Sequence, residues 1–254
     1  MAIIFFDIDG TLAERTEVPT SAAKAVARAR TAGHLVFICT GRPRRYAEEH
    51  FGVYADGFVC SNGRYAVRGS DTIISEPLLR QQIDTITNIL DEYNAGYAFC
   101  AKDDLYYGGN PAYRSVAHEV NGPAQELADA LEQDVELYNF DIYFADVEER
   151  EAITNALGDL CLVNPHGPHP SADVTVCGYN KGDAVRDVTA ALGIPHKDSY
   201  AFGDGINDLP MIRTAAHGIA MGNAVEEVKQ EAEFVTTDIH ANGVANGLKH
   251  YELA

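Results

Sequence analysis

The chain has 254 residues, of which 46% are hydrophobic, enough for one large domain or two smaller ones. Its 38 acidic and 19 basic residues give a formal net charge of −19, which disfavours nucleic-acid and membrane-surface partners. No apolar run approaches the roughly 20 residues of a membrane-spanning helix, and the first residues lack the basic segment of a signal peptide. The five scattered cysteines favour free, buried thiols, so we expect a cytoplasmic protein.

The first segment alternates short apolar runs with helical stretches. We expect strands at 3–6, 35–39 and 58–60, a helix at 22–32 and another beginning near Pro43. A hairpin is expected from 65–67 and 72–75. Continuous apolar strands are typical of a sheet covered on both faces.

The last third repeats this pattern. We expect helices at 181–192 and 209–216, and strands at 199–202, 218–221 and 234–236. Alternating strands and helices predict an α/β fold with a Rossmann-like parallel sheet and helices on both faces.

The middle of the chain has a different pattern. Helices are expected at 79–94, 123–133 and 147–157, and strands at 96–101, 105–107, 139–145, 160–163 and 174–177. Residues 140–144 alternate apolar and polar, which is typical of a sheet with one solvated face. We therefore expect an α+β cap domain at 79–177, inserted into a core domain formed by 1–78 and 178–254.

Asp7-Ile8-Asp9-Gly10-Thr11 directly follows the first predicted strand. Ligands of parallel α/β sheets bind beyond the carboxyl ends of strands, and two acids this close are costly to bury there without a cation. Gly10 permits a sharp turn. Taken alone, the motif is also compatible with a loop of solvated acids.

Three further motifs follow predicted strands or begin a helix. Thr40-Gly41-Arg42 offers a hydroxyl and a glycine amide to phosphate oxygens. Asn180-Lys181-Gly182-Asp183 places a lysine at a helix start, where it can counter an anion. The segment 203–208 carries Asp204 and Asp208 on a glycine-bearing turn, a donor set that suits Mg²⁺. Each alone is compatible with an ordinary polar turn, but the chain order lets all four converge.

Together these motifs resemble those of the haloacid dehalogenase-like superfamily of phosphohydrolases. The match is closer to its Cof-type sugar-phosphatase branch, which has a large cap inserted between the second and third motifs. The resemblance covers the whole chain and includes the turn Ser61-Asn62-Gly63. It implies a Mg²⁺-dependent phosphomonoesterase that acts on a small soluble phosphate, such as a sugar phosphate, through an aspartyl-phosphate.

The resemblance also implies a role for each motif residue. Asp7 would be the nucleophile, Asp9 the general acid and base, and Lys181 the charge-balancing catalytic residue. The substrate and phosphate would be bound by Thr40, Gly41, Lys181 and Asn207. Arg42 is a further candidate for substrate binding, because it is expected near the mouth of the site, where it could meet an anionic substrate. Mg²⁺ would be held by Asp7, by Asp204 and by the backbone carbonyl of Asp9. Asp208 would hold either the metal shell or Lys181.

Two alternatives stay open. A phosphomutase of the same superfamily needs a cationic clamp for a second phosphate. The cations of 79–177 are few, which favours hydrolysis: Arg80, Lys102, Arg114 and Arg150. A non-catalytic phosphate- or cofactor-binding protein is the second alternative, but binding alone does not need the pair of Asp7 and Asp9.

Overall fold

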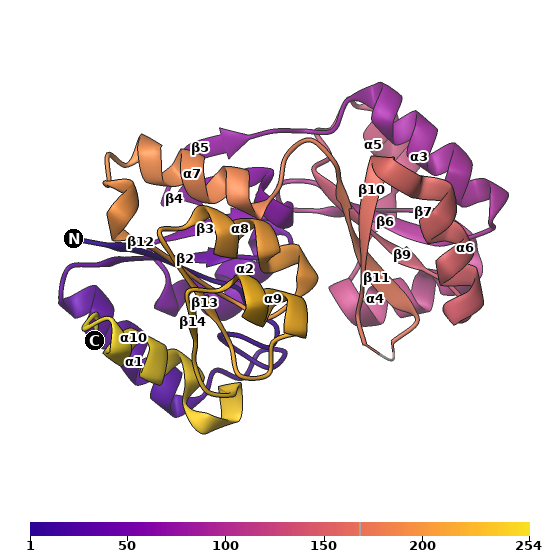
Figure 1. Cartoon of the computed structure of the whole chain (residues 1–254). Coiled ribbons are helices and arrows are strands. Elements are labelled where there is room, and N and C mark those ends of the chain that lie inside the picture. Colours follow the sequence, from indigo (N-terminus) through magenta and orange to yellow (C-terminus); the bar gives the residue numbers. More distant parts are fainter. Residues whose placement is uncertain (168) are drawn as a thin grey trace. The chain divides into compact units, whose positions relative to one another are not determined.

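The computed structural model describes residues 1–167 and 169–254. The chain divides into two units, drawn in Figure 1. The core unit comprises Met1–Ser75 and Asn180–Ala254, and the inserted unit comprises Glu76–Tyr179. We expected Leu78 in the core domain. In the structure it packs in the hydrophobic cluster of the inserted unit, and its amide donates to the Leu137 carbonyl oxygen at 2.7 Å.

An eight-stranded sheet forms the centre of the core unit, in the order β14-β13-β12-β1-β2-β3-β4-β5. Its strands are β1 (Ile3–Phe6), β2 (Leu35–Cys39), β3 (Gly57–Cys60), β4 (Tyr65–Arg68), β5 (Asp71–Ser75), β12 (Ser199–Gly203), β13 (His217–Ala220) and β14 (Phe234–Val235). The pairs from β14 to β3 are parallel, and β4 and β5 add the predicted antiparallel hairpin at one edge. All four residues of β1 are fully buried, as expected for a strand covered on both faces.

Helices cover both faces of this sheet. They are α1 (Thr20–Thr31), α2 (Arg44–Phe51), α7 (Lys181–Ala191), α8 (Leu209–Thr214), α9 (Glu226–Glu231) and α10 (Gly243–His250). In Figure 1, α1 and α10 pack together on one face, and α7 packs against α8 on the other. The predicted α/β core with helices on both faces is confirmed.

The direction in which strands are added to the sheet reverses at β1. The chain proceeds from β1 to β2 and β3 on one side, and later from β12 to β13 and β14 on the other. In parallel sheets such a switch point leaves an open crevice at the carboxyl ends of the strands. The first, second and fourth motifs follow β1, β2 and β12 and therefore meet there.

The inserted unit contains a second sheet, in the order β10-β11-β9-β6-β7-β8. Its strands are β6 (Gly96–Cys100), β7 (Leu105–Gly109), β8 (Gln125–Glu126), β9 (Asn139–Tyr143), β10 (Cys161–Pro165) and β11 (Ser171–Val176). Helices α3 (Arg80–Glu92), α5 (Leu127–Glu132) and α6 (Val147–Leu157) build one hydrophobic cluster with the sheet, in which the rings of Phe99 and Phe140 stack at 4.8 Å. This is the predicted α+β architecture.

Helix α4 (Arg114–Asn121) was not predicted, because its eight residues are fewer than the roughly 11–18 over which a helical period is recognised. The helix expected at 123–133 instead begins as β8 and continues as the shorter α5. Ala117 of α4 packs with Ala98, Tyr107 and Tyr143. Helix α4 therefore covers part of the sheet face that we expected to be solvated.

The described part of the chain contains no helix with both the length and the apolarity needed to cross a bilayer. Its five cysteines form no disulfide bonds. Four are buried as predicted, whereas Cys177 is exposed.

Candidate active site

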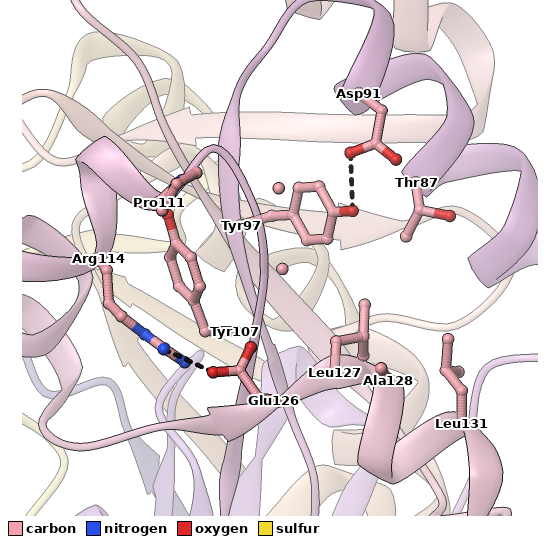
Figure 2. A pocket seen from close by; sticks show the side chains of 12 residues that line it. Thr87, Asp91, Tyr97, Tyr107, Pro111, Arg114, Glu126, Leu127, Ala128 and Leu131 are labelled. Carbon is pink, nitrogen blue, oxygen red and sulfur yellow. Dashed lines mark hydrogen bonds and ion pairs between the residues drawn. The ribbon is translucent and has the colours of Figure 1, made fainter.

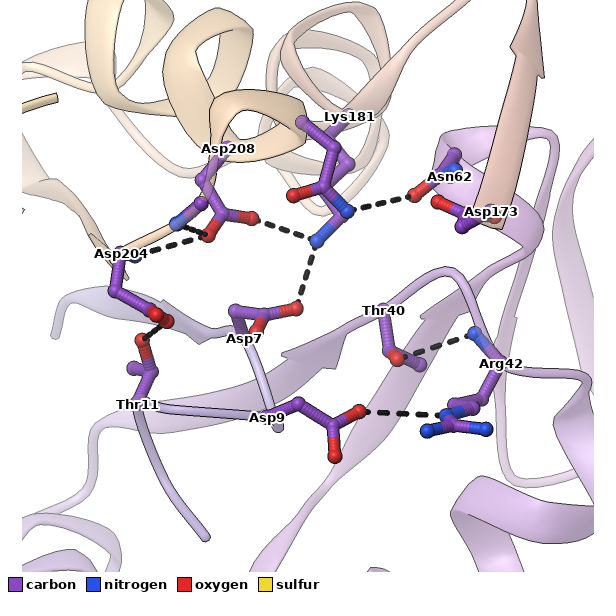
Figure 3. A network of polar contacts seen from close by, with 12 residues as sticks. Asp7, Asp9, Thr11, Thr40, Arg42, Asn62, Asp173, Lys181, Asp204 and Asp208 are labelled. Carbon is purple, nitrogen blue, oxygen red and sulfur yellow. Dashed lines mark hydrogen bonds and ion pairs between the residues drawn. The ribbon is translucent and has the colours of Figure 1, made fainter. Parts of the chain in front are cut away.

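A buried lysine joins two carboxylates at the carboxyl end of β1. Lys181 Nζ donates to Asp7 Oδ1 at 2.7 Å and to Asp208 Oδ1 at 2.6 Å (Figure 3). The lysine side chain is 0% exposed. Charge-assisted hydrogen bonds of this length offset part of the cost of removing all three groups from water. Lys181 is thus not part of an ordinary exposed polar turn, which was the alternative compatible with its motif alone.

The sequence of the third motif fixes where this lysine lies. The Asn180 side chain accepts hydrogen bonds from the amides of Gly182 and Asp183, and the Asp183 carboxylate accepts one from the amide of Asn180. This reciprocal capping begins α7 at Lys181. The helix start thereby directs the lysine at the loops after β1 and β12.

Asp208 uses both carboxylate oxygens on protein partners. Oδ1 accepts from Lys181, and Oδ2 accepts from the amides of Asp204 and Gly205 at 2.9 and 3.0 Å. Of the two roles expected for Asp208, the structure shows the contact with Lys181. The same side chain holds the loop that carries Asp204.

Asp204 is fixed from the other side by the first motif. Thr11 Oγ1 donates to Asp204 Oδ1 at 2.7 Å (Figure 3). Gly10 has a φ of +86°, and a Cβ there would lie 2.3 Å from Asp204 Oδ2. A glycine is required for this turn and for this close approach. Oxygens of Asp7, Asp204 and Asp208 lie within 4.8 Å of one another.

Crowding and burial shift the proton affinities in this cluster. Burial, reinforced by the charge of Asp208, raises the pKa of Asp7 well above its usual value, although Lys181 opposes the shift. Burial and the Asp208 charge raise the pKa of Asp204 to about 7. Burial would lower the pKa of Lys181, but Asp208 and Asp7 outweigh it and leave this pKa above its usual value. The cluster thus contains three acids and one lysine. A bound cation would offset this excess of negative charge.

Asp9 points away from this cluster. Its side chain is 46% exposed, and its Oδ2 accepts from Arg42 Nε at 3.3 Å (Figure 3). The Arg42 guanidinium lies 5.2 Å from the centre of the Tyr46 ring. The two acids of the first motif therefore have different partners: Asp7 contacts Lys181, and Asp9 contacts Arg42.

The remaining predicted phosphate-binding residues lie at the same end of the sheet. Thr40 is buried directly after β2, and its Oγ1 accepts from the amide of Arg42 at 3.1 Å. Gly41 and Asn207 are half-buried. Asn207 Nδ2 donates to Asn62 Oδ1 at 3.4 Å.

Comparison with known proteins matches residues 4–248 to the haloacid dehalogenase-like hydrolase family. The chain belongs to this family. The putative phosphatase YkrA of Bacillus subtilis (strain 168) is 32% identical, and the alignment covers 99% of this chain and 98% of that protein. The 5-amino-6-(5-phospho-D-ribitylamino)uracil phosphatase YitU of the same strain is 27% identical, over 98% and 97% of the two chains.

Among solved structures, the subclass IIB sugar phosphatase BT4131 superposes with a TM-score of 0.83 at 26% identity, covering 100% of both chains. The match spans both units of the chain. The protein is therefore an enzyme, a phosphatase of the haloacid dehalogenase-like family, and the predicted family and enzyme class are confirmed.

Three further residues form hydrogen bonds that position the candidate site of this phosphatase, and these contacts were not predicted from the sequence. They are Thr11 as the partner of Asp204, Asn62 as the partner of Asn207, and Asn223. Asn223 Nδ2 donates to the Gly10 carbonyl at 2.7 Å, and its Oδ1 accepts from the amide of Ile239 at 3.0 Å. Asn223 closely follows the parallel strand β13. The rule that ligands gather beyond strand ends could have identified it.

The inserted unit contains a cavity of about 460 Å³ (Figure 2). Tyr97 donates to Asp91 at 2.9 Å, and Arg114 donates to Glu126 at 2.6 Å while lying 5.0 Å from the centre of the Tyr107 ring. The charged groups of Asp91, Arg114 and Glu126 at this cavity therefore already have partners within its lining.

Replacing Lys181 by methionine tests the charge balance of the cluster. Loss of the ammonium leaves buried carboxylates without compensation, so we expect a destabilisation of about 3–5 kcal/mol in metal-free protein at pH 8. The folded-state pKa values of Asp7 and Asp204 are already raised, so their protonated forms predominate at low pH. The destabilisation should therefore be smaller at pH 5.

Thermal unfolding in EDTA at both pH values measures this effect, with Lys24→Met on the exposed face of α1 as control. Equal destabilisation by Lys181→Met at pH 5 and pH 8 would contradict the charge argument.

Proposed function

We propose that this phosphatase hydrolyses a small phosphomonoester, such as a sugar phosphate, with Mg²⁺ and through an aspartyl-phosphate on Asp7. The observation that carries the proposal is the buried Asp7 carboxylate, held by Lys181 beside Asp204, with a second acid two residues away. The relatives support the substrate class. BT4131 is named a sugar phosphatase, and YitU is named for a phosphorylated ribityl compound.

The carboxylate cluster fits Mg²⁺, which prefers a few oxygen donors and keeps several waters. Asp7, Asp204 and the carbonyl of Asp9 would hold the ion. Asp208 already uses its oxygens on Lys181 and two amides, so it would support these ligands from behind. When bound, Mg²⁺ supplies the positive charge that offsets repulsion between a carboxylate and a phosphate dianion.

In the first step, a carboxylate oxygen of Asp7 attacks phosphorus, and the bond from phosphorus to the leaving oxygen breaks. Asp9 donates a proton to that oxygen, and an alcohol leaves. Lys181 and the Thr40 hydroxyl compensate the charge of the transferring group, together with the Gly41 amide and Asn207. The chain thereby carries the phosphoryl group on Asp7.

In the second step, water attacks phosphorus and gives its proton to Asp9. The bond from phosphorus to Asp7 breaks, which releases inorganic phosphate and restores the carboxylate. This step leaves Asp9, whose Oδ2 lies 3.3 Å from Arg42 Nε, with the proton that it donates to the leaving oxygen in the next cycle. Arg42 would also meet the anionic substrate at the mouth of the site.

The cations of the inserted unit favour hydrolysis over phosphomutase activity. Arg80 pairs with Asp84 at 2.8 Å, Arg114 with Glu126 at 2.6 Å, and Arg150 with Glu151 at 3.7 Å. A mutase needs cations that bind a second phosphate. Three of the four predicted candidates already pair with carboxylates.

Asp7→Asn tests the covalent mechanism. The amide is not a competent nucleophile, so we expect kcat for p-nitrophenyl phosphate to fall more than about 10³-fold with the thermal midpoint preserved. Acid quenching with ³²P-labelled acetyl phosphate should leave label on the wild-type protein and none on Asp7→Asn. The exposed Asp71→Asn is the matched control. A wild-type enzyme that turns over without retaining label would overturn the mechanism.

The raised pKa of Asp204, about 7, predicts pH-dependent metal binding. Its protonated form stabilises the metal-free fold below pH 4, and this stabilisation is lost as pH rises through 7. Because Mg²⁺ needs the ionised form, it should raise the thermal midpoint by about 5 °C or more at pH 8 and much less at pH 5.5. Asp204→Ala should remove most of the effect. A Mg²⁺ shift of the same size at both pH values would refute this assignment.

Asp9→Asn tests the acid role. Protonation of the departing oxygen matters most for a poor leaving group. We expect a loss of about 10²–10⁴-fold in kcat/KM for an alkyl phosphate and a much smaller loss for p-nitrophenyl phosphate. Parallel assays on glucose 6-phosphate and p-nitrophenyl phosphate measure the difference, and equal losses would remove Asp9 from this role.

A further inference from the structure

A buried turn with an uncommon backbone follows β3. Ser61, Asn62 and Gly63 have φ values of 51°, 52° and 104°, all in the left-handed region, and all three are buried. Two successive residues with a Cβ rarely adopt this conformation, although asparagine tolerates it better than most. Such strain persists where the surroundings enforce it, and it concentrates at functional sites.

The turn is bonded to the second motif through its backbone. The amide of Asn62 donates to the Thr40 carbonyl at 3.1 Å, and the amide of Ser61 donates to the Arg42 carbonyl at 3.2 Å. The left-handed conformation aims both amides at the loop after β2. The path of that loop, and with it the Thr40 hydroxyl and the Gly41 amide, depends on the turn.

The same turn meets the third and fourth motifs. A Cβ on Gly63 would lie 2.4 Å from the Asn180 carbonyl oxygen and 3.0 Å from the Lys181 nitrogen, so glycine permits the start of α7 to lie this close. The Asn62 side chain accepts from Asn207 Nδ2 at 3.4 Å. Three residues thus touch three of the four motifs.

We propose that the turn 61–63 is a positioning element for this site, and that Asn62 orients the amide of Asn207 toward the phosphoryl group. The inference rests on the proposed function, which assigns Asn207 to that group. A carboxamide nitrogen can rotate away from a ligand, and an acceptor on one of its two N–H groups restricts this rotation and leaves the other free to donate. Asn62 therefore acts through Asn207 and is a positioning residue.

Two substitutions separate the side chain of Asn62 from its backbone. Glycine adopts the left-handed conformation without strain, so Asn62→Gly removes the carboxamide and keeps the turn. Alanine removes the carboxamide and adds strain. Asn242 provides matched controls, because it is an exposed left-handed asparagine (φ 65°) that directly precedes α10 and belongs to none of the motifs.

We expect Asn62→Gly to keep the thermal midpoint and to lower kcat for p-nitrophenyl phosphate about tenfold or more, with little change in KM. Asn62→Ala should lower both the midpoint and kcat. Asn242→Ala should lower the midpoint alone, and Asn242→Gly should change neither. Wild-type kcat in Asn62→Gly would overturn the inference, because the turn would then be structural only.

A double-mutant cycle tests whether Asn62 acts through Asn207. In an Asn207→Ala background, adding Asn62→Gly should cause no further loss of kcat, and it should not weaken inorganic phosphate binding further. Losses that multiply in full would overturn the inference. Failure of the proposed function would appear in the wild type, as absence of label on Asp7. In that case the double-mutant cycle would still test the inference through inorganic phosphate binding. This binding is measured as the thermal shift with Mg²⁺ and inorganic phosphate.

Discussion

The ion pairs of Lys181 with Asp7 and Asp208 are the contacts on which the core unit depends. An ammonium group with no solvent exposure is tolerable only where carboxylates lie within hydrogen-bond distance. The partners come from three separate places, the loop after β1, the start of α7 and the loop after β12. Once this cluster forms, the loops that carry Asp204 and the first motif have little freedom, because Thr11 and the carboxylate of Asp208 hold Asp204 from two sides.

A local imbalance of charge explains how so acidic a protein accommodates a phosphate. The net charge of −19 opposes an anionic ligand at long range, but salt screens that field beyond about 10 Å. Within the site, Lys181 and a bound divalent ion would set the potential. Burial and the charge of Asp208 raise the pKa values of Asp7 and Asp204, and the proposed Mg²⁺ would offset the excess of negative charge in this cluster.

The fold was predictable where the pattern of apolar residues is continuous. The runs 3–6 and 35–39 are buried strands at the predicted positions, and the hairpin β4–β5 lies at the sheet edge. The pattern failed for α4, because its eight residues are too short a stretch to reveal a helical period. Packing of Ala117 against Tyr107 and Tyr143 attaches this helix to the sheet. It also misplaced Leu78, because a single apolar residue before a helix does not reveal which cluster it joins.

The sequence by itself identified the candidate reactive groups, since acids, a hydroxyl and a carboxamide after strand ends and a lysine at a helix start are local patterns. It determined the start of α7 as well, because the caps of Asn180 and Asp183 are made within four residues. Only the tertiary structure decided which groups meet: that Asp208 holds Lys181, that Asp9 pairs with Arg42, and that the turn 61–63 touches three motifs. These partners lie far apart in the chain, and sheet order and packing bring them together, which no local pattern encodes.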